Sequence, residues 1–214
     1  MSDATCDVYV HTVALMGTVV TIQVVGHGAD RQERTEREQS VVRAVAWFHW
    51  INECCTRFDP RSELSRLAAN VGKAVPVSSM LYEAVGFALT VAEESGGAFD
   101  PTVGMRMEER GFNREFRSGN IVRTAIEPGS PVSYRDVRLD PEQMTITLLS
   151  PMMLDLGAVA KGLAIDMAAR ELKDFGNFAI DAGGDLYLGG RNAEGNPWSV
   201  GIRHPRDPQK LIET

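Results

Sequence analysis

Apolar residues recur at spacings of three and four in three stretches of the chain, which is the pattern of one buried helix face. We predict a first helix that ends near Cys55, a second between the serine pair 78–79 and Gly96, and a third that begins after Gly157 and stops at Gly176. Serine favours helix starts and glycine favours helix ends. The apolar positions of the three helices are Val41, Val45, Phe48, Ile51 and Cys55; Leu81, Val85, Leu89 and Ala92; and Ala164, Ile165, Ala168, Leu172 and Phe175.

Several shorter segments predict strands, and the clearest of them, residues 18–26, is rich in β-branched residues and ends at a glycine. They are residues 18–26 and 198–203 and the strand-turn-strand segments 137–150 and 178–190. Residues 58–70 indicate a turn and a short helix, whereas residues 105–131, rich in charge, Gly and Pro, indicate an irregular connection or flap. Because strands and helices do not alternate regularly and nothing repeats, we expect an α+β fold and not a Rossmann fold. The length allows one large or two small domains, and we predict a single domain, residues 1–214.

Composition narrows the class of protein. The 214 residues are 43% hydrophobic and 24% charged, which is enough to bury a sizeable core. The net charge of −7 and the dispersed basic residues argue against a nucleic-acid surface. Cys6, Cys54 and Cys55 are odd in number and two are adjacent, so we expect reduced structural thiols, not a disulfide framework or a metal site.

The N-terminal segment lacks a basic stretch followed by a long apolar one, and no stretch approaches the roughly 18 apolar residues that a membrane helix needs. For the chain as given we therefore expect a cytoplasmic location. A leader removed from the chain would instead direct it to the periplasm or to a membrane anchor.

Several common catalytic and nucleotide-binding motifs are absent from the sequence. It contains no GxGxxG, no GxxxxGK[ST] and no GxSxG. Its four histidines are scattered without metal-ligand spacing, and His49 lies within the first predicted helix, where a packing role is expected.

Lys161 is the first candidate for a ligand contact. It follows Asp155 and Gly157 in "LDLGAVAKGLAID", at the start of the third predicted helix. A cation is disfavoured near a helix N-terminus, where N–H groups are unpaired and the dipole is positive. A phosphate held between the helix start and Lys161 would remove this conflict. The alternative is a capped helix with a solvated lysine.

Three further glycine-containing stretches could carry chemistry. "SGGAFDPTVG" places Asp100 before a proline on a turn, and the alternative is an ordinary helix-ending turn. "IDAGGDLYLGG" has a glycine pair between Asp181 and Asp185 that would let backbone approach a ligand closely, although a tight hairpin explains the same residues. "ALMGTVV" offers Met16 before a strand, where a core methionine is the alternative.

The order and spacing of these stretches resemble a known family. The motifs are MGT, F-x-P-x-S-E-L-S, G-x-F-D-P-T-V-G, D-L-G-A-x-A-K-G-x-A-x-D, A-G-G-D and W-x-V-G-I-R-x-P. Together they look like the N-terminal two thirds of the FAD:protein FMN transferases, the ApbE family. The resemblance extends from Met16 to Pro205, and the D-L-G-A-x-A-K-G and F-D-P-T-V-G elements are its most specific parts.

The resemblance implies an α+β fold that binds FAD and Mg2+ and transfers FMN to a Ser or Thr hydroxyl of a target protein, releasing AMP. It also implies that the backbone carbonyl of Ala158 binds the metal and that Lys161 lies at the FAD pyrophosphate or the adjoining adenosine half. It assigns no catalytic base. The positions that match the family's flavin-nucleotide contacts are Met16, Phe58, Ala98, Phe99, Asp100 and Lys161.

The sequence also departs from the family pattern. Members of the family continue with an H-x-x-D-P-x-T-G motif and a D-x-x-x-T motif whose Asp and Thr complete the metal site, and neither motif occurs here. We therefore expect this chain to be one part of a longer transferase, completed by a separate C-terminal segment. Two alternatives stay open: a non-catalytic FAD-binding module, and a pyrophosphatase that splits FAD to FMN and AMP.

Overall fold

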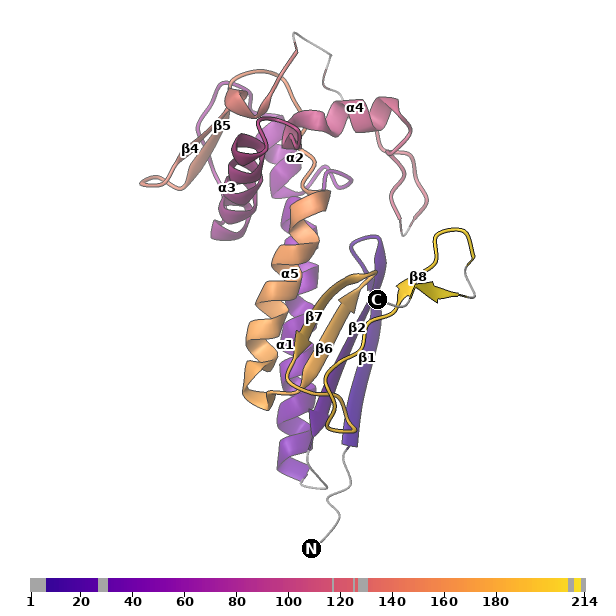
Figure 1. Cartoon of the computed structure of the whole chain (residues 1–214). Helices are drawn as coiled ribbons and strands as arrows, with labels where there is room; N and C mark the ends of the chain where they lie inside the picture. Colours follow the sequence, from indigo (N-terminus) through magenta and orange to yellow (C-terminus); the bar gives the residue numbers. More distant parts are fainter. Residues whose placement is uncertain are drawn as a thin grey trace, which may run out of the picture.

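Strands from residues 7–26 and 178–189 form one antiparallel sheet with the order β1-β2-β6-β7 (Figure 1). The computed structural model describes residues 7–26, 31–116, 118–124, 126, 131–207 and 210–212. Val20, Ile22 and Val24 alternate along β2 and are fully buried, which makes one face of the sheet apolar. The four strands are β1 (Asp7–Leu15), β2 (Thr18–Gly26), β6 (Phe178–Ala182) and β7 (Asp185–Gly189).

Two long helices lie side by side against this sheet (Figure 1). They are α1 (Arg31–Cys55) and α5 (Gly157–Leu172), and a 3-10 turn, η3 (Lys173–Phe175), follows α5 before Gly176. The apolar positions predicted for both helices are mostly buried at the expected spacing. Because α1 ends and α5 begins at the same end of the sheet, their termini meet beyond the sheet's edge.

A second group of elements covers that end of the molecule (Figure 1). Its three-stranded sheet has the order β3-β5-β4. Ser62 and Ser78 cap α2 and α3 by accepting the N–H groups of Ser65 and Leu81, at 3.0 and 3.3 Å. The elements are α2 (Glu63–Ala68), β3 (Val75–Pro76), α3 (Ser79–Glu94), η1 (Pro101–Val103), α4 (Gly104–Glu109), η2 (Tyr134–Asp136), β4 (Val137–Asp140) and β5 (Thr145–Leu148).

One apolar cluster runs through both groups of elements. It includes Val24 of the four-stranded sheet, Leu148 of the three-stranded sheet and Leu172 of α5. The α+β class predicted from the sequence is confirmed by this mixture of helices and antiparallel sheets. The assignment of residues 1–214 to a single domain stays a prediction.

Two sequence-based boundaries need correction. Helix α4 occupies Gly104–Glu109, where we predicted the start of an irregular connection, and beyond it Arg114 and Ile121 form an isolated antiparallel bridge. The strand predicted over residues 198–203 is reduced to β8 (Ile202–Arg203), which pairs with β9 (Leu211–Ile212). Its apolar residues find no buried face, since Val200 and Ile202 are about half exposed.

Within the described ranges, no helix is both long enough and apolar enough to cross a membrane. The cytoplasmic location stays a prediction. Cys54 and Cys55 are free thiols at the end of α1, with their sulfur atoms 3.2 Å apart, whereas Cys6 lies outside the described residues.

Candidate functional site

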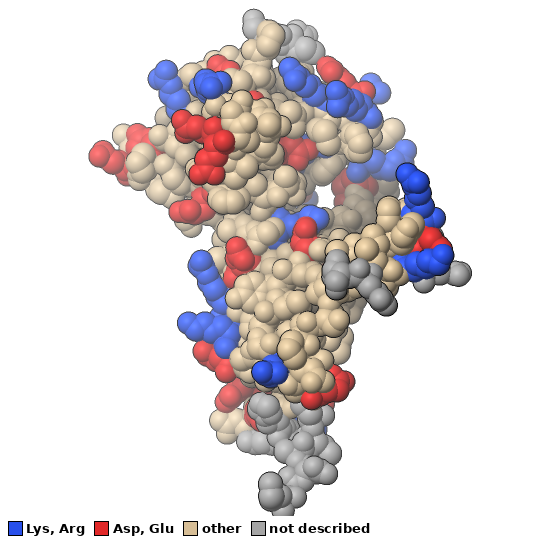
Figure 2. All heavy atoms as spheres, viewed as in Figure 1, with Lys and Arg blue, Asp and Glu red and all other residues tan. Residues whose placement is uncertain are grey.

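A cleft of about 910 Å³ opens where α1 ends and α5 begins. The turn between β1 and β2 and the loop after α4 complete its walls, and Figure 2 shows the molecule hollowed there, with side chains of both charges around the opening. Among the residues singled out from the sequence, Met16, Phe58 and Lys161 line this cleft. They come from three segments far apart in the chain, so the fold brings these predicted contacts together.

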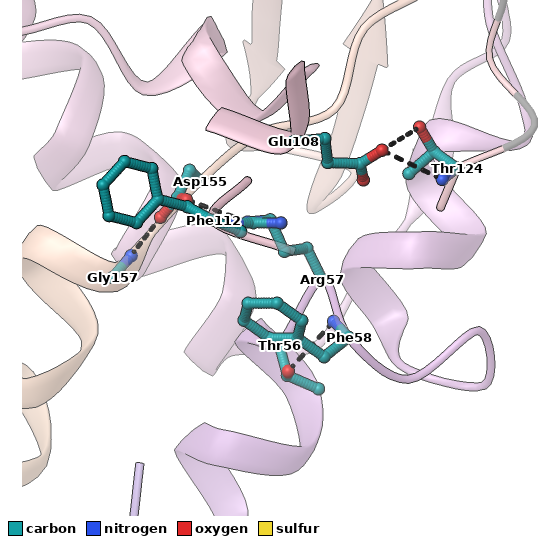
Figure 3. A network of polar contacts seen from close by, with 8 residues as sticks. All are labelled: Thr56, Arg57, Phe58, Glu108, Phe112, Thr124, Asp155 and Gly157. Atoms are coloured by element: carbon teal, nitrogen blue, oxygen red, sulfur yellow. Dashed lines mark hydrogen bonds and ion pairs between the residues drawn. The ribbon is translucent and has the colours of Figure 1, made fainter. Parts of the chain in front are cut away.

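Arg57 lines the cleft and contacts Asp155, Phe112 and Phe58 (Figure 3). Its side chain is only 6% exposed. The Nε group donates to Oδ2 of Asp155 at 2.8 Å, Nη2 donates to the carbonyl of Phe112, and the guanidinium carbon lies 4.3 Å from the ring centroid of Phe58. One buried guanidinium therefore joins the end of α1, the approach to α5 and the loop after α4.

Asp155 organises the first turn of α5. Its Oδ1 accepts the N–H of Gly157 at 2.9 Å, so the carboxylate satisfies one of the unpaired donors of the helix start and complements the dipole there. Its own N–H donates to the carbonyl of Pro101 at 2.7 Å. These bonds fix the start of α5 against the segment that carries the F-D-P-T-V-G motif.

Lys161 lies one turn further along α5 and is 31% exposed. Its Nζ forms an ion pair with Oδ2 of Asp185, at 2.8 Å. The lysine is therefore neither fully solvated nor free: it points to a carboxylate at the start of β7, next to the cleft.

The turn that delivers Asp185 is closely packed. Gly183 and Gly184 have φ angles of +71° and +98°, and Oδ1 of Asp181 accepts the N–H of Gly184 at 2.8 Å. A Cβ atom on Gly183 would lie 2.0 Å from the hydroxyl oxygen of Thr18. The A-G-G-D stretch thus forms the tight hairpin turn that was the alternative to a ligand-binding turn. Its glycine pair packs against the M-G-T turn.

Four of the residues matched to the family's contacts do not line the cleft: Ala98, Phe99, Asp100 and Ala158. Both oxygens of Asp100 have partners in the chain. Oδ1 accepts the N–H and the hydroxyl of Thr102, at 2.9 and 2.8 Å, and Oδ2 accepts the N–H of Tyr134 at 3.1 Å. In this structure Asp100 caps η1 and holds η2. The ligand roles of these four residues stay predictions.

Sequence reasoning did not single out Arg57, Arg114 or Phe116, all of which line the cleft. The helical periodicity ends at Cys55, so it gives no information on Arg57. The only signal in the sequence is that Arg57 directly precedes Phe58, the first residue of a matched motif. Arg114 and Phe116 lie in the segment predicted to be an irregular connection or flap, where no periodicity exists to assign a face.

Local contacts shift the pKa of two groups in the cleft wall. Hydrogen bonds from the Arg61 side chain and backbone lower the pKa of Asp59, which stays ionised. The hydrogen bond with Cys54, together with burial, raises the pKa of Cys55. Cys55 is therefore a neutral thiol near neutral pH and does not act as a thiolate nucleophile.

The comparison with known proteins decides the family. The sequence model of the ApbE family matches residues 16–214. This chain belongs to the ApbE family. The ApbE protein of Thermotoga maritima has the same fold, with a TM-score of 0.77 and 27% identity over 97% of this chain and 66% of that chain.

Two curated ApbE relatives are FAD:protein FMN transferases. The protein of Haemophilus influenzae is 27% identical over 201 residues, which are 89% of this chain and 57% of that protein. The protein of Vibrio cholerae is 29% identical over 168 residues, which are 76% of this chain and 50% of that protein. The chain thus spans about half the length of these relatives.

Proposed function

We propose that this chain is the FAD-binding part of a flavin transferase, which moves FMN from FAD to a Ser or Thr hydroxyl of an acceptor protein and releases AMP. The names of the ApbE relatives support the reaction. The observation in this chain that supports it is the cleft itself, because Met16, Phe58 and Lys161 meet there beside the N-terminus of α5.

The cleft offers what a flavin dinucleotide requires. Its volume of about 910 Å³ suits a large ligand, and its wall includes both apolar and aromatic side chains. The guanidinium of Arg57 packs over the ring of Phe58. A planar ring system of a ligand could stack on the phenyl ring. Lys161 would place its ammonium group next to the pyrophosphate, beside the start of α5.

The proposed transfer is a displacement at phosphorus. The acceptor hydroxyl oxygen bonds to the phosphorus of the FMN half, and the bond from that phosphorus to the bridging oxygen breaks. The bridging oxygen leaves with AMP and keeps the electron pair. The hydroxyl proton goes to a base that we do not assign among the described residues. Negative charge grows on the phosphate oxygens, so positioning and the charge of Lys161 are the chain's contribution.

The described residues do not by themselves fit a Mg2+ site. Those ranges hold no group of three or more His, Cys, Asp or Glu side chains that could share a metal ion. Near the cleft, Asp155 is paired with Arg57 and Asp185 with Lys161. A hard cation requires several free oxygen ligands. We derive no step through the metal, and the carbonyl of Ala158 stays a predicted single ligand.

A separate C-terminal segment would supply the remaining ligands in our proposal. The Haemophilus and Vibrio relatives, of which this chain covers 57% and 50%, support a longer functional unit. Two alternative functions remain. An FAD-binding module would bind FAD without turnover, and an FAD pyrophosphatase would transfer FMN to water instead of to an acceptor hydroxyl.

Mass spectrometry of an acceptor peptide with a single Ser or Thr tests the proposal. The peptide is incubated with this chain, FAD and Mg2+, and the Vibrio cholerae flavin transferase serves as the positive control. A phosphoester-linked FMN together with equimolar AMP would establish the transfer and show that this chain suffices without the proposed C-terminal segment. FMN and AMP without an adduct would instead establish the pyrophosphatase. Bound FAD without either product would contradict transfer by this chain alone.

A further inference from the structure

The ion pair between Lys161 and Asp185 lies at the edge of the cleft, and only one of its two residues lines the cleft. Lys161 lines the cleft, whereas Asp185 is not among the lining residues and contacts the lysine from β7. The two side chains are 31% and 53% exposed. Asp185 can therefore reach solvent without unpacking the core, and the pair can open.

The position of Asp185 is fixed by the turn before it. The left-handed glycine pair and the hydrogen bond from Gly184 to Asp181 define where β7 begins. The close approach of Gly183 to Thr18 ties this turn to the hairpin that carries Met16. The backbone position of Asp185 is thus fixed by the sheet, and this position places its carboxylate within reach of Lys161.

The negative charge of Asp185 disfavours the binding of a phosphate at Lys161. A ligand phosphate that approaches Lys161 meets an ammonium already paired at 2.8 Å, with a second negative charge beside it. The paired carboxylate neutralises the ammonium group, so the pair offers little net charge to an anion. The ligand gains its contact with the lysine only by displacing or tolerating Asp185.

We propose that Asp185 is a resident counter-ion that weakens phosphate binding at Lys161, and so sets the affinity of the cleft for phosphate-bearing ligands and the ease with which they leave. This inference rests on the proposed role of Lys161 in the FAD site. Asp185 acts through Lys161 and is a positioning residue, not a catalytic one. The pair keeps the lysine ordered at the cleft, and its cost is a reduced affinity for the anion.

Dissociation constants for three probes test the inference: inorganic pyrophosphate, FAD and riboflavin, each titrated calorimetrically without metal. We expect Asp185→Asn to bind pyrophosphate and FAD about 1.4- to 5-fold more tightly, which is the range expected for an exposed ion pair. Riboflavin, which has no phosphate, should bind equally to both proteins. A purely structural role of Asp185 would affect all three probes alike.

Two variants serve as controls. In a Lys161→Met background, which keeps the aliphatic stem, Asp185→Asn should no longer tighten pyrophosphate binding. Glu171→Gln also removes one negative charge, in this case from the ion pair between Glu171 and Arg43. Glu171 lies on α5 ten residues after Lys161, about 15 Å along the helix axis, so this substitution should leave all three constants unchanged.

The outcomes separate this inference from the proposed function. Unchanged or weaker pyrophosphate binding by Asp185→Asn, tightening that persists without Lys161, or no pyrophosphate binding by any variant would overturn the counter-ion role. Tighter pyrophosphate binding in a chain that does not bind FAD would support the counter-ion and contradict the FAD site.

Discussion

Replacing Arg57 with Met tests how much its guanidinium contributes to the stability of the protein. The substitution keeps an aliphatic side chain of similar length but removes the guanidinium from Asp155, from the Phe112 carbonyl and from the Phe58 ring. Loss of one partner of a fully buried ion pair costs about 3–5 kcal/mol, because the other charge stays buried without a partner. Here the Asp155 side chain is 21% exposed, and water can partly replace the guanidinium.

We therefore expect Arg57→Met to lower the free energy of unfolding by about 2–3 kcal/mol, below the range for a fully buried pair. Urea unfolding at neutral pH, with a common slope for all variants, measures this loss. Arg61→Met is the matched control, since Arg61 pairs with Asp59 but its side chain is 89% exposed, and this substitution should be far less destabilising. Equal losses for the two variants would refute the reasoning.

The remaining predictions follow from two pKa shifts. Hydrogen bonds from Trp47 and Arg43 lower the pKa of Glu171 below its ordinary 4.5, so this stabilisation is present above the unfolded pKa and is lost as the pH falls through the folded one. Between about pH 6 and pH 3 the wild type should lose more thermal stability than Glu171→Gln, and parallel melting curves would contradict this. Cys55 is buried and its pKa is raised, whereas Cys54 is partly exposed, so iodoacetamide should modify Cys54 faster near pH 8. Peptide mapping would show this difference, and equal rates would disprove it.

The long helices could be predicted from the sequence because their burial is periodic. The buried positions of α1 and α5 repeat every three or four residues, and serine and glycine mark the ends of α3. Strand β1 was not predicted, because it is an edge strand with residues partly exposed on both faces. The segment 198–203 carried a strand pattern but has no buried face on which that pattern could act.

The site was predictable as a set of motifs but not as a geometry. Lys161 and the glycine pair could be singled out because each departs from ordinary helix or strand preferences. The bond between Arg57 and Asp155 joins residues 98 positions apart, and the pairing of Lys161 with Asp185 depends on the register of β7. Such contacts follow from the packing of α1, α5 and the sheet, about which local periodicity gives no information.

Hydrogen-deuterium exchange of the full chain, with and without saturating FAD, tests the central claim that this cleft is the FAD site. The account predicts slower exchange in the β1–β2 turn around Met16, in residues 56–61 and in the first two turns of α5. It predicts no change in the first turns of α1, at the other end of the sheet. Protection confined to the far end, or binding without protection of the α5 start, would contradict it.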